Sequence, residues 1–222
     1  MNFFAFPFGE WPFVFLAIMT GLTLHEFAHA YFAYKFGDPT AKNEGRVTLN
    51  PMAHLDLIGT VLFFIAGFGW ARPVPANRGY FKHPRLMGIV VSIAGPLSNL
   101  LIATVSVALL SVIYHLDVFD KLNNGQLVAL LRFFQYMLAL NITLFIFNLI
   151  PLPPLDGYRV VQDLVSPMTR AKLSQYEQWG VYLFLLIVFI PPLSRMILNP
   201  LFGFGRDIIR LLASLFGIGE LL

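Results

Sequence analysis

The chain has 222 residues, of which 57% are hydrophobic and 12% are charged, with a formal net charge of +3. Soluble domains average about 25% charged residues, so the composition indicates a membrane protein. The chain has no cysteine. This excludes disulfides and thiolate metal sites, and any metal must be held by His, Asp or Glu. The basic residues are spread through the links between apolar segments, which argues against a nucleic-acid partner.

Three apolar stretches are long enough to cross a bilayer, which takes about 20 residues. They cover residues 11–34, 87–114 and 133–155, and the second and third contain no Asp, Glu, Lys, Arg or His. We therefore predict three core transmembrane helices. The first 13 residues lack the basic region of a signal peptide. We therefore expect the first apolar segment to be part of the mature protein and not a cleaved signal peptide.

A shorter apolar run, residues 57–71, decides the topology. As a helix it would span only about 22 Å, short of a hydrocarbon core of about 30 Å. If it does not cross, the ten basic residues of segments 35–56, 72–85 and 156–177 (three, four and three) share one face, against Lys121 and Arg132 opposite. Because basic links favour the cytoplasm, we predict a re-entrant hairpin and an N-terminus outside.

The remaining elements complete the expected fold. Alternating Arg46, Thr48 and Asn50 suggest a short strand whose edge could pair with an extended substrate. Residues 178–217 are expected to form C-terminal helices, a kinked crossing followed by an interfacial helix. The prediction is an all-α polytopic membrane protein with three core transmembrane helices, a re-entrant or short β element and C-terminal helices. We expect residues 1–222 to form a single membrane-embedded domain, with its core at 11–160 and its C-terminal helices at 178–217.

Three ionisable residues interrupt the first apolar segment, in the sequence HEFAH at His25, Glu26 and His29. On a helix, positions i and i+4 project from one face, so both imidazoles can bind one Zn²⁺. Zinc lowers the pKa of a bound water towards about 7, and Glu26 is placed to take its proton as general base. The pattern therefore predicts a zinc hydrolase; a pair of histidines hydrogen-bonded within a bundle is the alternative.

A catalytic zinc usually has three protein ligands, so one more is needed. The best donor is Asp156, in the stretch FNLIPLPPLDGYRV. The prolines end the third long helix and Gly157 permits a turn, which leaves Asp156 on a stiff, non-helical stretch. In the predicted topology it lies on the same side as the histidines; a simple turn at a helix end is the alternative.

With HEFAH early, NLIPLPPLDG late and SIAGPLSN between them, the sequence resembles the site-2 protease family of intramembrane zinc metalloproteases, in its compact prokaryotic form without a PDZ domain. The resemblance covers residues 20–165. It implies His25, His29 and Asp156 as zinc ligands and Glu26 as the base.

By the same resemblance, Asn99 lies near the active site, where an amide could hold a substrate carbonyl or the oxyanion; an interhelical hydrogen bond is an equal alternative. The resemblance also implies a transmembrane protein or peptide as substrate. From the apolar segments and the basic links, we expect a multi-pass protein of the cell (inner) membrane with its active site towards the cytoplasmic side. We expect structural roles for His54 and Asp56.

Three other functions remain open at this level. A metal transporter would need further ionisable residues along its crossings, and the second and third segments have none. A CAAX-type membrane protease would take its remaining ligands from a downstream helix motif. An inactive scaffold is not excluded by sequence, although all three ligands and the base are present.

Overall fold

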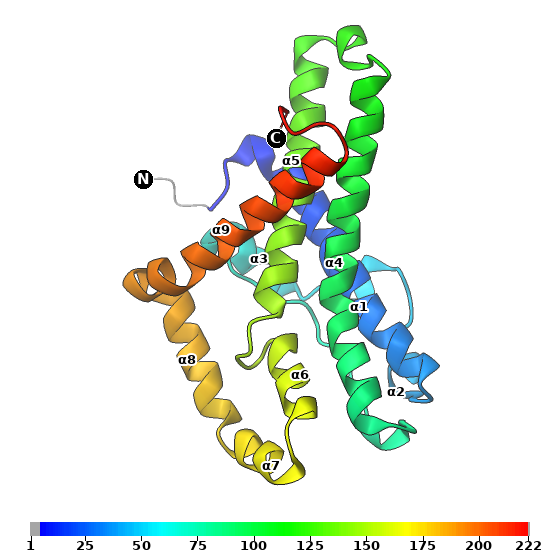
Figure 1. Ribbon diagram of the computed structural model, residues 1–222, viewed down its shortest axis with the longest axis vertical. Coiled ribbons are helices and arrows are strands. Elements are labelled where there is room, and N and C mark those ends of the chain that lie inside the picture. Colours follow the sequence, from blue (N-terminus) through cyan, green and yellow to red (C-terminus); the bar gives the residue numbers. More distant parts are fainter. Residues whose placement is uncertain (1–4, 222) are drawn as a thin grey trace.

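The computed structural model describes residues 5–221, so the first four residues of the stretch considered as a signal peptide lie outside it. Three long helices dominate the described part: α1 (Trp11–Lys35), α4 (Pro84–His115) and α5 (Asn124–Asn148). They pack against one another (Figure 1). Each is long and apolar enough to cross a membrane, with α1 counted together with the turn η1 (Phe8–Glu10). The prediction of an all-α, multi-pass membrane protein is therefore confirmed.

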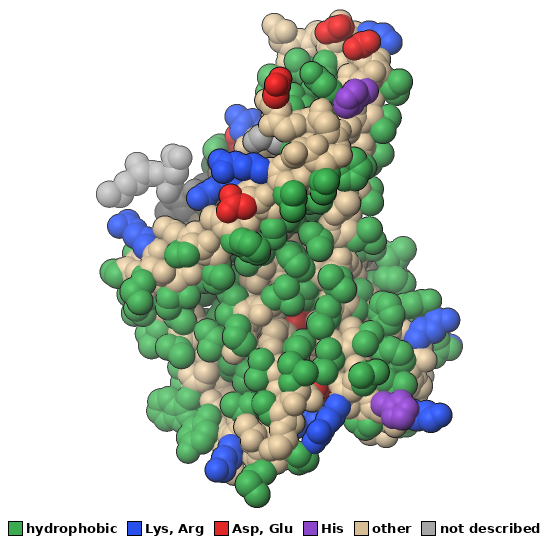
Figure 2. Space-filling model, viewed as in Figure 1, with side chains coloured by type: hydrophobic (Ala, Val, Ile, Leu, Met, Phe, Trp, Pro, Cys, Tyr) green, Lys and Arg blue, Asp and Glu red, His purple; other side chains and the backbone are tan. Residues whose placement is uncertain are grey.

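The core joins these helices by apolar packing. Ala17 of α1, Ile102 of α4 and Met137 of α5 form one cluster. A second cluster joins α4, α5 and the C-terminal helix around Leu110 and Ile142. Apolar side chains also cover the middle of the face seen in Figure 2, while most charged ones lie towards its two ends. This distribution matches a protein whose middle faces lipid.

The third long helix, α5, covers Asn124–Asn148 and not the predicted residues 133–155. It begins at a capping box, in which Asn123 accepts a hydrogen bond from the Gln126 backbone and Gln126 accepts one in return. Arg132 lies inside the helix, 3.5 Å from the Glu10 carboxylate. The charge of Arg132 is thus paired inside the helix, which ends at Asn148, before the prolines.

The links on one side of the three helices contain short elements: α2 (Thr40–Asn43), η2 (Pro51–Ala53), α3 (Leu57–Ala66) and η3 (Arg78–Tyr80). The turn between α4 and α5 holds η4 (Phe119–Lys121). α3 has ten residues, which as a helix span about 15 Å. Leu55 and Ala71 form an antiparallel bridge. The chain after α3 therefore returns to the residues that directly precede α3.

The expected strand at residues 46–50 is wrong, since the described residues contain no strand apart from that isolated bridge. The polar groups of residues 46–50 form hydrogen bonds with groups other than a neighbouring strand. Arg46 is buried and donates to backbone carbonyls. Asn50 caps η2 by accepting from the Met52 N–H, and the Thr48 carbonyl binds His54. Alternation of polar residues here reflects these separate partners and not a sheet edge.

The chain after α5 forms α6 (Asp156–Leu164), α7 (Pro167–Gln175), α8 (Glu177–Phe189) and α9 (Pro191–Leu215). α8 and α9 meet at an angle of 90°, and together they are long and apolar enough to form one bent span. α9 crosses over α5 on the face shown in Figure 1. Pro191 begins α9, because its ring cannot continue α8.

The buried carboxylate of Asp163 anchors α6, two turns after Asp156. Arg78 donates to its Oδ2 at 2.7 Å, and Arg170 of α7 lies 3.3 Å from its Oδ1. On α4, a Cβ at Gly88 would fall 2.8 Å from the Arg78 Nε, so only glycine leaves room for the pair. Burial raises the pKa of the Asp163 carboxyl, and the arginines oppose that shift. These ion pairs hold α6 in place.

Replacing Asp163 by alanine should destabilise the protein, because two arginines would lose their carboxylate. Removing one partner of a buried pair costs about 3 kcal/mol, and somewhat less where the arginines are partly exposed, as here. Thermal unfolding in detergent should show a lower midpoint. Asp207→Ala, which removes an exposed carboxylate beside Arg210, is the control. Equal midpoints for both variants would contradict the anchoring role.

Candidate metal centre and active site

Two imidazoles and one carboxylate converge in the middle of the protein. His25 and His29 lie one turn apart on α1, and Asp156 reaches them from the first residue of α6. The three form the potential metal-binding group found among the described residues, and all three are buried. The structure therefore brings together residues that are more than 120 positions apart in the chain.

Hydrogen bonds fix which ring nitrogen of each histidine faces the carboxylate. His25 Nδ1 donates to the Asn99 Oδ1 at 2.8 Å, and His29 Nδ1 donates to the Val91 carbonyl at 2.7 Å. Both Nε2 atoms are then left as acceptors. Asp156 Oδ2 is buried without a hydrogen-bond partner within the described residues. Three buried acceptors with no donor between them are the environment that a cation requires.

The spacing of these acceptors fits a tetrahedral zinc ion. The two Nε2 atoms lie 3.0 Å apart, and the Asp156 Oδ2 lies 3.0 Å from His25 Nε2 and 3.3 Å from His29 Nε2. Bonds of about 2.0 to 2.1 Å in a tetrahedron separate two ligand atoms by about 3.3 Å. The donor set and its geometry thus suit the same metal.

Glu26 lies beside this centre and is held by a distant part of the backbone. Its Oε2 accepts a hydrogen bond of 3.1 Å from the Val74 N–H, which belongs to the extended segment after α3. Both Glu26 and His25 face two cavities. One carboxylate oxygen is thus fixed, which leaves the other to act on a ligand of the centre.

Asn99 is fully buried and uses its amide within the protein. Besides the contact with His25, its Nδ2 donates to the Gly21 carbonyl at 3.1 Å and to the Asn141 Oδ1 at 3.0 Å. It thereby links α1, α4 and α5. These contacts place Asn99 behind the imidazole, on the side away from the metal, where outer ligands set the orientation of the ring.

Asp156 opens a helix, which corrects the expectation of a non-helical stretch. Prolines occupy the preceding turn, and α6 starts at Asp156 itself. Gly157 is needed for a different reason than a turn, because a Cβ there would lie 2.7 Å from the Ile150 carbonyl oxygen and still closer to that of Leu149. The close approach of α6 to the end of α5 carries the carboxylate to the histidines.

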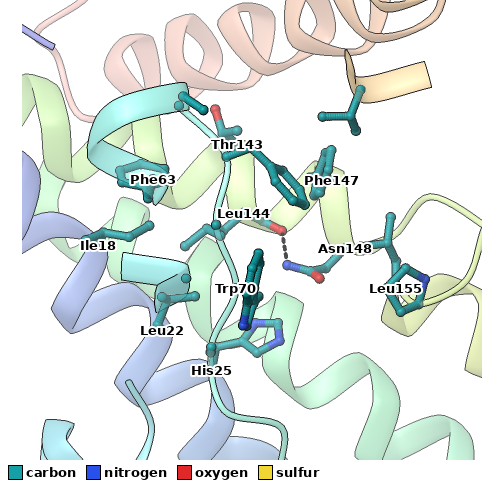
Figure 3. Close-up of a pocket in the computed structure, with 18 of the residues that line it drawn as sticks. Ile18, Leu22, His25, Phe63, Trp70, Thr143, Leu144, Phe147, Asn148 and Leu155 are labelled. Carbon is teal, nitrogen blue, oxygen red and sulfur yellow. Dashed lines mark hydrogen bonds between the residues drawn. The ribbon is translucent and has the colours of Figure 1, made fainter. Parts of the chain in front are cut away.

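An apolar cavity of about 410 Å³ adjoins the centre. Figure 3 shows Ile18, Leu22, Phe63 and Phe147 around it, with His25 at its edge. Side chains of α8 and α9, among them Phe184, line it as well. A smaller hollow of about 90 Å³ is also lined by Glu26, together with all three metal ligands and the polar side chains of Ser92, Asn148 and Arg159. The site is therefore open to an apolar and to a polar space.

Two residues that sequence reasoning missed help to form the site. Gly95 faces both imidazoles, since a Cβ there would lie 2.7 Å from the His25 Nε2 and even closer to His29. Its spacing of four from Asn99 on one helix face could have indicated this position. Asn148 lines both cavities, and its Nδ2 donates to the Leu144 carbonyl at 2.9 Å (Figure 3).

His54 and Asp56 have local contacts away from the metal centre. His54 is fully buried and its Nε2 donates to the Thr48 carbonyl at 2.8 Å. Asp56 caps α3 by accepting from the Gly59 N–H at 2.8 Å. Neither belongs to the group of metal-binding residues found in the described part of the chain.

This combination of three long apolar helices, a His-His-Asp centre and an adjacent glutamate defines a membrane-embedded zinc metalloprotease. Residues 13–191 match the model of Peptidase family M50. The chain belongs to this family, which confirms the resemblance to site-2 proteases and the zinc ion as cofactor. No solved structure matches the chain.

Curated relatives include bacterial proteins named as candidate zinc metalloproteases. YwhC of Bacillus subtilis (strain 168) is 48% identical over 97% of both chains. Rip2 of Mycolicibacterium smegmatis is 29% identical, covering 86% of this chain and 73% of its own. Rip2 of Mycobacterium tuberculosis (strain H37Rv) is 30% identical, covering 81% and 68% respectively. The similarity to YwhC thus spans nearly the whole sequence.

Gly95→Ala should weaken zinc binding, because the new methyl group would displace both imidazoles. We expect zinc affinity to fall by about 10- to 100-fold, as for other changes around metal ligands. Helix propensity alone predicts a slight gain from glycine to alanine. Gly203→Ala in α9, where a Cβ meets nothing closer than 3.7 Å, is the matched control. Zinc titration of the two purified variants makes the comparison, and equal affinities would contradict the packing argument.

Proposed function

We propose that this protein is an endopeptidase that hydrolyses peptide bonds within or near transmembrane segments of membrane proteins. The observation that carries the proposal is the position of the base: Glu26 lies in the middle of α1, a helix suited to span a membrane, and faces a large apolar cavity. A substrate for such a site has to be an apolar segment. Family membership supports the same reaction class.

A zinc ion, when bound, supplies Lewis acidity that activates water for attack on an amide. His25, His29 and Asp156 hold it. The free oxygen of Glu26 takes a proton from the water as the water oxygen attacks the scissile carbonyl carbon. Glu26 then gives this proton to the amide nitrogen as the carbon–nitrogen bond breaks, which leaves an amine and a carboxylic acid that carries the second hydrogen of the water. The acid passes this proton to the amine, and a carboxylate and an ammonium group remain.

We assign different tasks to the two asparagines near the centre. Asn99 orients His25, because its amide hydrogens already bind Gly21 and Asn141. Asn148 is a better candidate for contact with substrate. It lines both cavities, and its contact with Leu144 engages one of its two amide hydrogens. The second can bind a carbonyl oxygen of the substrate or the developing oxyanion.

We further propose that residues 57–71 form a re-entrant hairpin and that the site opens to the cytoplasm. The bridge between Leu55 and Ala71 and the shortness of α3 support the hairpin. The basic links of segments 35–56, 72–85 and 156–177 then share the cytoplasmic face. The polar hollow beside Glu26 supplies room for water on that side.

Glu26→Gln should abolish cleavage without loss of zinc. The amide cannot accept the proton, so we expect kcat to fall about 100-fold or more, while the three ligands remain. The assay uses purified protein in vesicles of phosphatidylethanolamine and phosphatidylglycerol, a fluorescent peptide with one transmembrane segment, and zinc analysis of each variant. Cleavage by Glu26→Gln at the wild-type rate would overturn the assignment of the base.

Asp156→Ala should lose both zinc and activity. Removing a ligand is expected to weaken zinc binding by more than the 10- to 100-fold typical of outer residues. Asp120→Ala, in the turn between α4 and α5, serves as the control. A wild-type protein that binds zinc but leaves the transmembrane peptide intact, and instead carries zinc across the vesicle membrane, would favour transport over proteolysis.

A further inference from the structure

Arg46 is a buried cation that the reaction described above does not use. Only 3% of its surface is exposed, although it lies in the link between α2 and η2. Among the described residues, no carboxylate lies within ion-pair distance of its guanidinium. A buried guanidinium is costly unless hydrogen bonds compensate. Its position therefore needs an explanation.

The guanidinium binds the backbone of the segment that holds the base. Its Nη2 donates to the carbonyl oxygens of Arg72 and of Pro73, the latter at 3.1 Å. The next residue is Val74, whose N–H donates to Glu26. Pro73 C=O and Val74 N–H belong to one peptide group, so this side chain holds the same peptide group that binds the catalytic carboxylate, together with the peptide group before it.

Besides Arg46, a few separate contacts keep this segment in position, among them the hydrogen bond from the Asn77 N–H to Asp38. The segment lies between α3 and η3 in neither a helix nor a sheet, so regular backbone hydrogen bonds do not hold it. The Arg72 N–H donates to the His54 carbonyl at 2.7 Å, and the His54 ring donates to the Thr48 carbonyl. Residues that follow Arg46 in the chain thus hold the same segment.

Burial lowers the pKa of the Arg46 guanidinium, and the Glu26 carboxylate opposes that shift more strongly than Glu44 does. Arginine stays protonated in proteins. The side chain therefore keeps its charge and all its N–H donors in this buried position.

We propose that Arg46 is a positioning residue for catalysis: it clamps the backbone of Arg72 and Pro73, and through the Val74 N–H this clamp fixes the Glu26 carboxylate beside the metal centre. The inference rests on the proposed function of Glu26 as the base. A general base must be held within hydrogen-bond reach of the water it activates, and a displacement of about 1 Å can cost about 100-fold in rate.

The kinetic test compares Arg46→Met and Arg46→Lys with Arg85→Met, which removes an exposed basic residue from the first turn of α4. In the vesicle assay, kcat of Arg46→Met should fall at least tenfold, with KM within twofold of wild type and one zinc per chain. Arg46→Lys keeps the charge and a single donor nitrogen, so it should recover part of the loss. The control should match wild type.

A merely structural role would give a different pattern. Activity would then fall in proportion to the folded, zinc-loaded fraction, and the remaining active molecules would show the wild-type kcat. That result, or an unchanged kcat in Arg46→Met, would overturn the proposal. If Arg46→Met does not fold, Arg46→Lys carries the same comparison.

Hydrogen exchange tests the clamp without any substrate. The peptide covering residues 70–77 should exchange faster in Arg46→Met than in wild type, while peptides from α1 and α6 keep their protection. Glu26→Ala should expose the Val74 amide as well, and Arg85→Met should change nothing. Unchanged exchange at 70–77 in Arg46→Met would overturn the clamp. If wild type fails to cleave the peptide, the proposed function fails, and exchange still decides whether Arg46 holds the segment.

Discussion

The main physical constraint in this structure is the close approach of three buried acceptor atoms. Their mutual repulsion is relieved by a cation. His25 Nε2, His29 Nε2 and Asp156 Oδ2 lie 3.0 to 3.3 Å from one another in a buried, mostly apolar setting. In such surroundings an uncompensated charge or lone pair is expensive. A divalent ion converts this cost into the attraction that joins α1 to α6, and so couples metal binding to the fold.

Polar contacts around the centre are arranged so that each donor has a defined partner. Asn99 connects the imidazole of His25 with α1 and α5, and the Val91 carbonyl orients His29. In lipid such interhelical hydrogen bonds also contribute to helix association. Gly95 complements them by leaving space, because any side chain there would fill the volume of the imidazoles. Orientation and close approach are thus supplied by the same face of α4.

Two spaces with different chemistry meet at Glu26. The larger is apolar and lies among α1, α5, α8 and the segment after α3, whereas the smaller contains the metal ligands and polar groups. Hydrolysis of an apolar segment needs both an apolar site for the chain and a supply of water. The extended segment at Val74 borders the polar space and binds the base. The position of this segment therefore affects both the base and the space available to water.

The sequence by itself determined the local part of the site. The His25–Glu26–His29 spacing places the side chains on one helix face through geometry that involves only four residues. The absence of cysteine and the unusual Asp156 after a proline-rich turn indicated the third ligand. Composition and segment length established a membrane protein with three long helices. The structure bears out the three long helices and the His-His-Asp metal-binding group, because segment length and the spacing within one helix depend on neighbours in the chain.

Only the tertiary structure decided which groups support those residues. The contact of Val74 with Glu26 spans 48 positions and that of Asn99 with His25 spans 74. The absence of a strand at residues 46–50, within the described chain, follows from the burial of Arg46 against a distant backbone. Partners of this kind are selected by packing, and packing is not encoded in the periodicity of any single segment.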